Sequence, residues 1–168
     1  QGAYEGKPLH FIGHLQTNKV KYIVGVVDLI ESVDRLELLE CIEKQAAKIG
    51  VTQDILFEVN IGAEESKSGV GPDDLWPLLD AAAAKTHIKV RGLMAIPPAD
   101  ADDTATRRFF AEMRELLAKA AACGYGNARM NILSMGMSHD YAAAIAEGAT
   151  IVRVGTAIYG ARDYSKKK

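Results

Sequence analysis

The chain has 168 residues, of which 48% are hydrophobic and 25% are charged, and it carries a formal net charge of -2. These values are typical of a single globular domain with a sizeable core, and the charge argues against a nucleic-acid-binding surface. No apolar run approaches the length of a membrane span and no signal peptide begins at Gln1, so we expect a cytoplasmic protein that binds neither membranes nor nucleic acid. Cys41 and Cys123 have neither disulfide nor metal-site spacing.

The first 50 residues predict two strand-and-helix units. Residues 9–12 have the pattern of a strand, a helix follows around 18–25, and residues 29–33 form the second expected strand. Asp34 and Glu37 have the spacing of a capping box, so we expect a helix to begin there. The apolar positions of this helix recur at helical spacing, at Leu36, Leu39, Ile42, Ala46 and Ile49.

Two further units follow by the same criteria. Residues 55–60 form the third expected strand, and Pro72 is expected to open a helix that runs to about Lys85. Residues 90–96 form the fourth expected strand. A long helix that ends near Gly124 comes next, and its apolar side is formed by Phe109, Met113, Leu116, Leu117 and Ala120.

The last fifth of the chain has two polar, glycine-bearing turns, each of which follows an apolar strand. The first strand is expected over 131–133, and the turn 134–138 comes directly after it. Ser138 stands where an N-cap would open a helix over 139–147, which Gly148 would end. Taken alone, Ser138 is more often an ordinary helix cap than an anion ligand.

The second turn follows an almost continuously apolar strand at 150–154. Arg153 interrupts this strand, and because an unpaired buried guanidinium is costly, we expect it to face a ligand or a carboxylate. Position alone does not choose between a structural ion pair and a ligand contact. Gly155 and Thr156 then offer backbone N–H groups and a hydroxyl. Together the two turns favour a phosphate-binding site.

The six alternations of strand and helix predict right-handed crossover units and a parallel sheet. A doubly wound sheet and a barrel share this pattern, but a glycine-rich dinucleotide fingerprint is absent and polar residues cluster at most strand ends. In a (β/α)8 barrel the site is built from those ends, commonly with phosphate held after strands seven and eight. The two turns match that place if they follow the seventh and eighth strands of a barrel. The chain would then contain six of the eight strand-and-helix units that a barrel needs.

Seven segments of the chain form a series that carries a family resemblance. They are residues 10–19 (HFIGHLQTNK), 31–34 (ESVD), 57–61 (FEVNI), 67–69 (KSG), 91–97 (RGLMAIP), 134–140 (SMGMSHD) and 153–162 (RVGTAIYGAR). In this order they resemble the pyridoxal phosphate homeostasis proteins, which have the barrel fold of the alanine racemase N-terminal domain. Each segment alone is weak evidence, but seven in order are specific and cover essentially the whole chain.

The resemblance implies a (β/α)8 barrel of the alanine racemase N-terminal type, with residues 1–168 as a single domain that holds the last six units. In that family, pyridoxal phosphate forms a Schiff base with a lysine at the end of the first strand. No matching segment precedes Leu9. We therefore expect the first two units, about 60 residues that include this lysine, to lie outside the sequence.

The resemblance also implies which residues contact the cofactor. Ser138, Gly155 and Thr156 should hold the phosphate. Arg153 should face the pyridine nitrogen, where it keeps that nitrogen unprotonated and weakens the cofactor as an electron sink. Four further residues complete the expected set, His10 and Met94 in the ring pocket and Ser134 and Met135 in the first turn. No catalytic or metal-binding residue is expected.

By the same resemblance, the expected function is the binding and delivery of pyridoxal phosphate in vitamin B6 homeostasis without major catalysis. Apo-enzymes that use the cofactor are the expected recipients, and the intact protein is expected to be a monomer or a weak dimer. A racemase of this fold needs a second domain, and only four residues follow Tyr164. Two alternatives stay open: a weak racemase or lyase with His10 or Tyr159 as acid–base group, and a barrel for another phosphorylated metabolite.

Two lesser expectations concern surface chemistry. Lys67 and the lysines at 166–168 could carry the aldehyde transiently, although solvated surface charge is the commoner role of such residues. The isolated 168-residue chain is expected to associate, because the open edges of an incomplete barrel are templates for aggregation. A monodisperse monomer that melts cooperatively would contradict this expectation.

Overall fold

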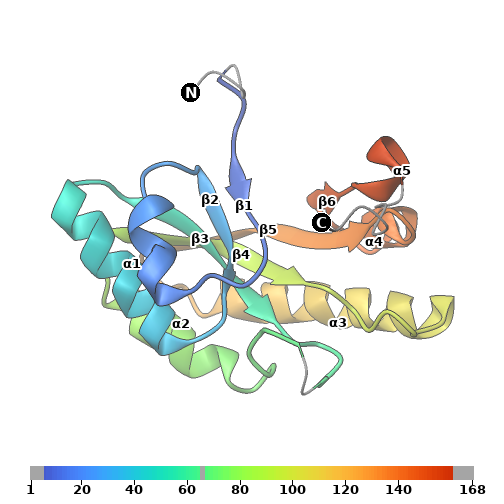
Figure 1. Cartoon of the computed structure of the whole chain (residues 1–168). Coiled ribbons are helices and arrows are strands. Elements are labelled where there is room, and N and C mark those ends of the chain that lie inside the picture. Colours follow the sequence, from blue (N-terminus) through green and yellow to red (C-terminus); the bar gives the residue numbers. More distant parts are fainter. Residues whose placement is uncertain (1–5, 65–66, 161–168) are drawn as a thin grey trace.

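The computed structural model describes residues 6–64 and 67–160, and within these ranges six strands alternate with helices (Figure 1). The elements alternate as the sequence predicts. In chain order they are β1 (His10–Phe11), the 3-10 helix η1 (Thr17–Tyr22), β2 (Leu29–Val33), α1 (Leu36–Ile49), β3 (Gln53–Val59), α2 (Leu75–Ala83), β4 (Ile88–Ala95), α3 (Asp103–Ala122), β5 (Ala128–Met137), α4 (Tyr141–Ala146), β6 (Ile151–Arg153) and α5 (Thr156–Tyr159).

The strands form one sheet in which every pair of neighbours is parallel and the order follows the sequence, β1-β2-β3-β4-β5-β6. Parallel neighbours need a crossover connection, and helices provide most of these crossovers. Helices α1, α2 and α3 lie along one face of the sheet (Figure 1). The predicted α/β class with a parallel sheet is therefore confirmed.

A hydrogen bond between distant strands shows that the sheet is strongly curled. The Ser134 hydroxyl in β5 lies 2.6 Å from a carboxylate oxygen of Glu31 in β2. In a flat sheet these strands would be three spacings, or about 14 Å, apart, which is farther than the two side chains reach. On the same inner face, a guanidinium nitrogen of Arg153 in β6 reaches across β5 and lies 3.0 Å from the carbonyl oxygen of Ala95 in β4. The sheet is thus a curled half-barrel with a concave inner face.

The two faces of the sheet bury different layers of side chains, because successive residues of a strand point to opposite sides. On the outer face, the register partners Phe57 and Leu93 are fully buried in the main core with the helices. On the inner face, a smaller apolar layer consists of Leu29, Leu56 and Met94 with Ile132 and Ile151 packed against it. This inner layer supports the polar side chains that follow it toward the carboxyl ends of the strands.

Helix α1 confirms the middle of the predicted apolar spacing but neither its two ends nor the predicted cap. Leu39, Ile42 and Ala46 are fully buried, whereas Leu36 and Ile49 are 50% and 45% exposed. The capping box is wrong, because the N-cap residue is Arg35 and no side chain caps the helix. The Asp34 carboxylate instead accepts a hydrogen bond of 2.6 Å from the guanidinium of Arg35. The Asp34 carboxylate, which was expected to bind N–H groups at the start of the helix, therefore binds the neighbouring Arg35.

Three element boundaries also differ from the predictions. The expected helix at 18–25 is the shorter 3-10 helix η1, and α2 begins at Leu75 because residues 72–74 form a turn. Strand β5 continues through Met137, across the expected turn at 134–138. The cause is the pairing of Met137 with Arg153 in β6, which holds this segment in the sheet.

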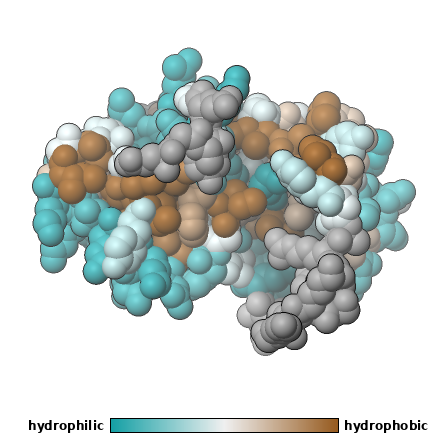
Figure 2. All heavy atoms as spheres, turned by 45° about the horizontal axis from the view of Figure 1, so that its top comes forward, coloured by the Kyte–Doolittle hydropathy of each residue, from teal (hydrophilic) through white to brown (hydrophobic). Residues whose placement is uncertain are grey.

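Exposed apolar side chains gather near both ends of the sheet. The face at the top of Figure 1 carries a band of hydrophobic residues with hydrophilic residues along its rims (Figure 2). The most exposed large apolar residues belong to the segments next to β1 and β6, and they include Ile12, Tyr22, Ile145, Ile158 and Tyr159. No helix in the described ranges has the length and apolar character needed to span a bilayer.

Candidate functional site

The carboxyl ends of the strands bring five polar side chains together inside the half-barrel. They come from five different strands, and all but one of them are largely buried. The five are His10 in β1, Glu31 in β2, Glu58 in β3, Ser134 in β5 and Arg153 in β6. A curled parallel sheet makes this possible, because the inner-face residues at one end of all its strands converge.

Four of these residues form a continuous hydrogen-bonded chain. The Arg153 guanidinium donates to the Ser134 hydroxyl at 2.6 Å, and that hydroxyl donates to the Glu31 carboxylate at 2.6 Å. The other carboxylate oxygen of Glu31 lies 2.8 Å from Nδ1 of His10. The chain links β6, β5, β2 and β1 and fixes the direction of each side chain.

Arg153 is held by its surroundings in a fixed place at the end of β6. Its side chain is only 8% exposed, and its second nitrogen donates to the carbonyl oxygen of Ala95. Burial lowers the pKa of Arg153, while the carboxylates of Glu31, Glu58 and Asp140 oppose that shift. The nearest Glu31 oxygen is 4.0 Å from the guanidinium. The site therefore holds one well-anchored cation among acidic neighbours.

Glu58 lies beside this chain and is not part of it. Its register partner is Met94, which in turn pairs with Ser134, so the three residues form a row across the inner face. Glu58 is 7% exposed, and its Oε2 atom has no hydrogen-bond partner among the residues that the structure describes. Burial, and after it the charge of Asp34, raise the pKa of Glu58 to about 7, although Arg153 opposes the shift.

The raised pKa of Glu58 makes the stability of the protein depend on pH. The folded state binds this proton more tightly than the unfolded state, so the free energy of unfolding should fall as the pH rises from about 5 to about 7. The expected loss is about 3 kcal/mol, and Glu58→Gln should remove most of it. Urea unfolding of both proteins at pH 5 and pH 8 measures the effect. Equal pH dependence in the two proteins would contradict it.

The second part of the site is exposed and consists of two adjoining segments, one directly after β5 and one directly after β6. The Ser138 hydroxyl oxygen accepts hydrogen bonds from the backbone N–H groups of Gly155, at 3.1 Å, and Ala157, at 3.2 Å. Gly155 and Thr156 are exposed, and a side-chain carbon built on Gly155 would meet nothing within 4 Å. An oxygen already lies against two backbone donors in an open turn, which is the arrangement that binds phosphate oxygens.

The prediction that Ser138 caps the following helix is wrong. Helix α4 begins at Tyr141, its N-cap is Asp140, and no side chain caps it. The Asp140 carboxylate accepts a hydrogen bond of 2.6 Å from the N–H of Met137 and so closes the turn. Ser138 is therefore free to bind backbone groups that lie 17 and 19 residues later in the chain.

The structure brings most of the predicted site residues together. Ser138 lies in the segment after β5, and Gly155 and Thr156 lie in the adjoining segment after β6. The chain of side chains beneath them contains Arg153, Ser134 and His10. The other two are buried in apolar layers. Met94 lies in the inner layer below the polar residues, and Met135 lies in the main core on the outer face. The side chain of Met135 is thus on the opposite side of the sheet from Ser134.

Sequence reasoning missed Glu31 and Glu58. Each is the single charged residue of an otherwise uncharged stretch, 29–33 for Glu31 and 55–59 for Glu58, which is the same signal that singled out Arg153. A buried guanidinium needs carboxylate partners, so the three charges could have been sought as one group. Their pairing could not have been read from spacing, because they lie on three strands.

Lys67 is described by the structure and lies on the loop after β3. Its ammonium group donates to the carbonyl oxygen of Pro97 at 3.1 Å and forms an ion pair of 2.5 Å with Glu64. These contacts hold the side chain near the end of β4. Its role as a transient carrier of an aldehyde stays a prediction. The lysines at 166–168 lie outside the described residues.

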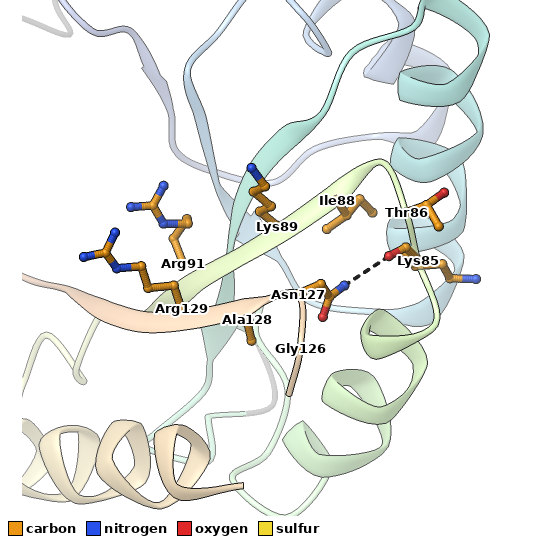
Figure 3. A pocket seen from close by; sticks show the side chains of 9 residues that line it. All are labelled: Lys85, Thr86, Ile88, Lys89, Arg91, Gly126, Asn127, Ala128 and Arg129. Atoms are coloured by element: carbon orange, nitrogen blue, oxygen red, sulfur yellow. Dashed lines mark hydrogen bonds between the residues drawn. The ribbon is translucent and has the colours of Figure 1, made fainter. Parts of the chain in front are cut away.

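A basic cavity of about 390 Å³ lies at the opposite, amino end of β4 and β5 (Figure 3). Arg91 and Arg129 point to the same side of the neighbouring strands, with Lys89 beside them. Arg91 forms an ion pair of 2.6 Å with Asp54 in β3. The inner apolar layer separates this cavity from the polar residues at the carboxyl ends, so it is not part of the candidate site.

The comparisons with known proteins agree with this geometry. The family described as the alanine racemase N-terminal domain matches residues 2–163. A pyridoxal phosphate homeostasis protein from Aquifex aeolicus is 48% identical over 155 residues, which are 92% of this chain and 67% of that protein. This chain belongs to the pyridoxal phosphate homeostasis protein family. A second member, from Pseudomonas aeruginosa, is 43% identical over 92% of the chain and 65% of its own length.

A solved structure of the same family shows the same fold. It is PipY of Synechococcus elongatus with PLP bound, which is 34% identical, with a TM-score of 0.82 over 90% of this chain and 69% of that one. The expected family is thereby confirmed. The chain spans about two thirds of the length of these family members.

Proposed function

We propose that this chain binds pyridoxal 5′-phosphate and acts in intracellular vitamin B6 homeostasis, where it holds and delivers the cofactor without major catalysis. One observation carries the proposal: the Ser138 hydroxyl and the N–H groups of Gly155 and Ala157 meet in an exposed turn, directly beyond the buried Arg153. Family members carry the name of this role, and PipY has been solved with PLP bound.

At the phosphate end, the residues fit a charged oxygen. The N–H groups of Gly155 and Ala157 now donate to an uncharged hydroxyl, and each would form a stronger hydrogen bond with a phosphate oxygen. Ser138 could then turn its O–H toward the same phosphate, and Thr156 offers a second hydroxyl beside it. Because the turn is open, a phosphate can enter without unfolding any element.

At the ring end, Arg153 provides a fixed donor. The bound cofactor supplies an aldehyde that traps amines and a pyridine ring that can accept electrons. A guanidinium cannot give up its proton at neutral pH, so Arg153 would hydrogen-bond the ring nitrogen without protonating it. This favours holding the aldehyde over strong carbanion chemistry. Ser134 accepts directly from Arg153, and Glu31 and His10 hold Ser134 in place. Met94 supplies apolar surface below.

We further propose that the half-barrel is the last six units of an eight-unit barrel and that residues 1–168 form one domain of it. Three observations support this: within the described residues the outer strands β1 and β6 have one neighbour each, exposed apolar residues gather beside them, and the family members are longer. The lysine that forms the Schiff base would then lie outside these 168 residues. We propose a monomer or weak dimer in the cytoplasm, with apo-enzymes as recipients.

The test uses pyridoxine 5′-phosphate, which has the ring and phosphate of the cofactor but no aldehyde, so it cannot form imines with surface lysines. Calorimetric titration of the chain should show saturable binding at one site. Ser138→Ala should weaken that binding by about tenfold or more, because it removes a hydrogen bond to a charged group. Thr104→Ala removes a hydroxyl from an exposed position on α3 and should leave the dissociation constant unchanged.

Two outcomes would contradict the proposal. Absence of saturable binding would refute it for this chain. In a competition experiment, inorganic phosphate could displace bound pyridoxine 5′-phosphate at the same concentration as unlabelled pyridoxine 5′-phosphate does. That result would show that the site does not recognise the ring. The second result would favour the alternative of a barrel for another phosphorylated metabolite.

A further inference from the structure

In the part of the chain that the structure describes, Glu58 is the charged inner-face residue at the carboxyl ends of the strands that does not belong to the hydrogen-bonded chain. It is 7% exposed, and its Oε2 atom is buried without a partner among the described residues. A buried carboxylate oxygen without a partner costs free energy, so such a group either stays protonated or meets a partner that arrives with a ligand. Glu58 points into the same interior as Arg153, which is the proposed contact of the ring.

The groups that face Glu58 come from the neighbouring strands. On β2 and directly after it lie the carboxylates of Glu31 and Asp34, and on β6 lies the cation Arg153. The row through Glu58 itself continues to Met94 in β4 and Ser134 in β5, neither of which is charged. One carboxylate, Asp34, and one cation, Arg153, thus act on Glu58 with opposite signs, and Arg153 already donates to the hydroxyl that faces Glu31.

We propose that Glu58 is a further contact of the bound ring, and that as the neutral acid it donates a hydrogen bond to an oxygen substituent of the pyridine ring. The inference rests on the proposed function, since it concerns the same site. The ionised carboxylate would have no proton to donate and would repel an anionic phosphate ester. Binding of vitamin B6 phosphates is thus coupled to the proton on Glu58, and the site binds them more tightly at acidic than at alkaline pH.

The size of the effect follows from the population of the binding-competent form. With a pKa of about 7, nearly all of Glu58 is neutral at pH 6 and about a tenth is neutral at pH 8. If only the neutral acid binds, the dissociation constant rises about tenfold between these pH values. An amide at the same position keeps a donor at every pH and removes this dependence.

The experiment measures the dissociation constant of pyridoxine 5′-phosphate at pH 6, 7 and 8 for three proteins: wild type, Glu58→Gln and the control Glu115→Gln. Glu115 is an exposed carboxylate on α3, far from the inner face in the fold. The phosphate and ring of the probe also titrate, so the informative quantity is the ratio of two dissociation constants at each pH. That ratio cancels the ionisation of the probe.

We expect the ratio of wild type to Glu58→Gln to rise about tenfold from pH 6 to pH 8, and the ratio of wild type to Glu115→Gln to stay constant. A flat ratio for Glu58→Gln, with both proteins binding, would overturn the Glu58 proposal and leave the proposed function standing. A ratio that falls with pH would also overturn it, because the carboxylate would then be the better partner. Loss of binding in all three proteins at every pH would refute the proposed function itself, and the Glu58 contact with it.

Discussion

Replacing Arg153 by methionine is expected to lower the free energy of unfolding by about 3 kcal/mol. The change removes the cation that lies 4.0 Å from the Glu31 carboxylate, while Glu31 stays 1% exposed. It also removes the donor to the Ser134 hydroxyl and the donor to the carbonyl oxygen of Ala95. His10 still pairs with Glu31, which keeps the expected loss at the lower end for a broken buried pair. Urea unfolding at pH 7 measures it.

The control for this prediction is a double variant. Adding Glu31→Gln to Arg153→Met removes the uncompensated charge, so the double variant should be more stable than Arg153→Met alone. Additive losses from the two changes would show that the charges act independently. Arg153→Met should also weaken pyridoxine 5′-phosphate binding at least tenfold, and the double variant should not restore that binding, because the ring contact is still absent.

Replacing Gly92 by alanine is expected to prevent folding. Gly92 has a φ of 152° in β4, and a side-chain carbon there would lie 1.8 Å from the carbonyl oxygen of Ile132 in β5. The next nearest atoms also belong to the Ile132 backbone, so no side chain can turn away to make room. β4 and β5 would have to separate in the middle of the sheet, at a cost above about 4 kcal/mol. Circular dichroism and the yield of soluble protein measure the outcome.

A matched glycine gives the control. Gly126 lies in the loop before β5, and a side-chain carbon built there meets nothing within 4 Å. Gly126→Ala should change stability by no more than about 0.5 kcal/mol. If Gly92→Ala melted at the same temperature as Gly126→Ala, the close approach of β4 and β5 at this point would be wrong.

The hydrophobic pattern predicted which elements exist, and the pairing of strands decided where they end. Leu39, Ile42 and Ala46 recur at helical spacing and lie on the buried side of α1, as expected. The turn expected at 134–138 was wrong, because Met137 pairs with Arg153 and keeps β5 extended. That pairing joins residues 16 positions apart, so no local pattern near residue 134 contains it.

The sequence predicted which residues gather at the candidate site better than it predicted which partners they contact. Arg153 stood out as a charge inside an apolar strand, and the structure gives it two partners on other strands, Ser134 and Ala95. Ser138 was named correctly as a residue of the turn, but its expected partner, the following helix, was wrong. Which side chains bind the cofactor is still a prediction that the titrations above would test.

By itself the sequence determined the alternation of strand and helix, the family, and the presence of a charged residue at the end of a buried strand. These features depend on the order of side chains along a few turns or strands, where polarity and spacing act locally. Only the tertiary structure decided that Glu31 and Ser134, 103 residues apart, form one hydrogen bond and that Oε2 of Glu58 has no hydrogen-bond partner within residues 6–64 and 67–160. The physical reason is curvature: the twist and curl of the whole sheet set which inner-face side chains meet, and no short segment encodes that distance.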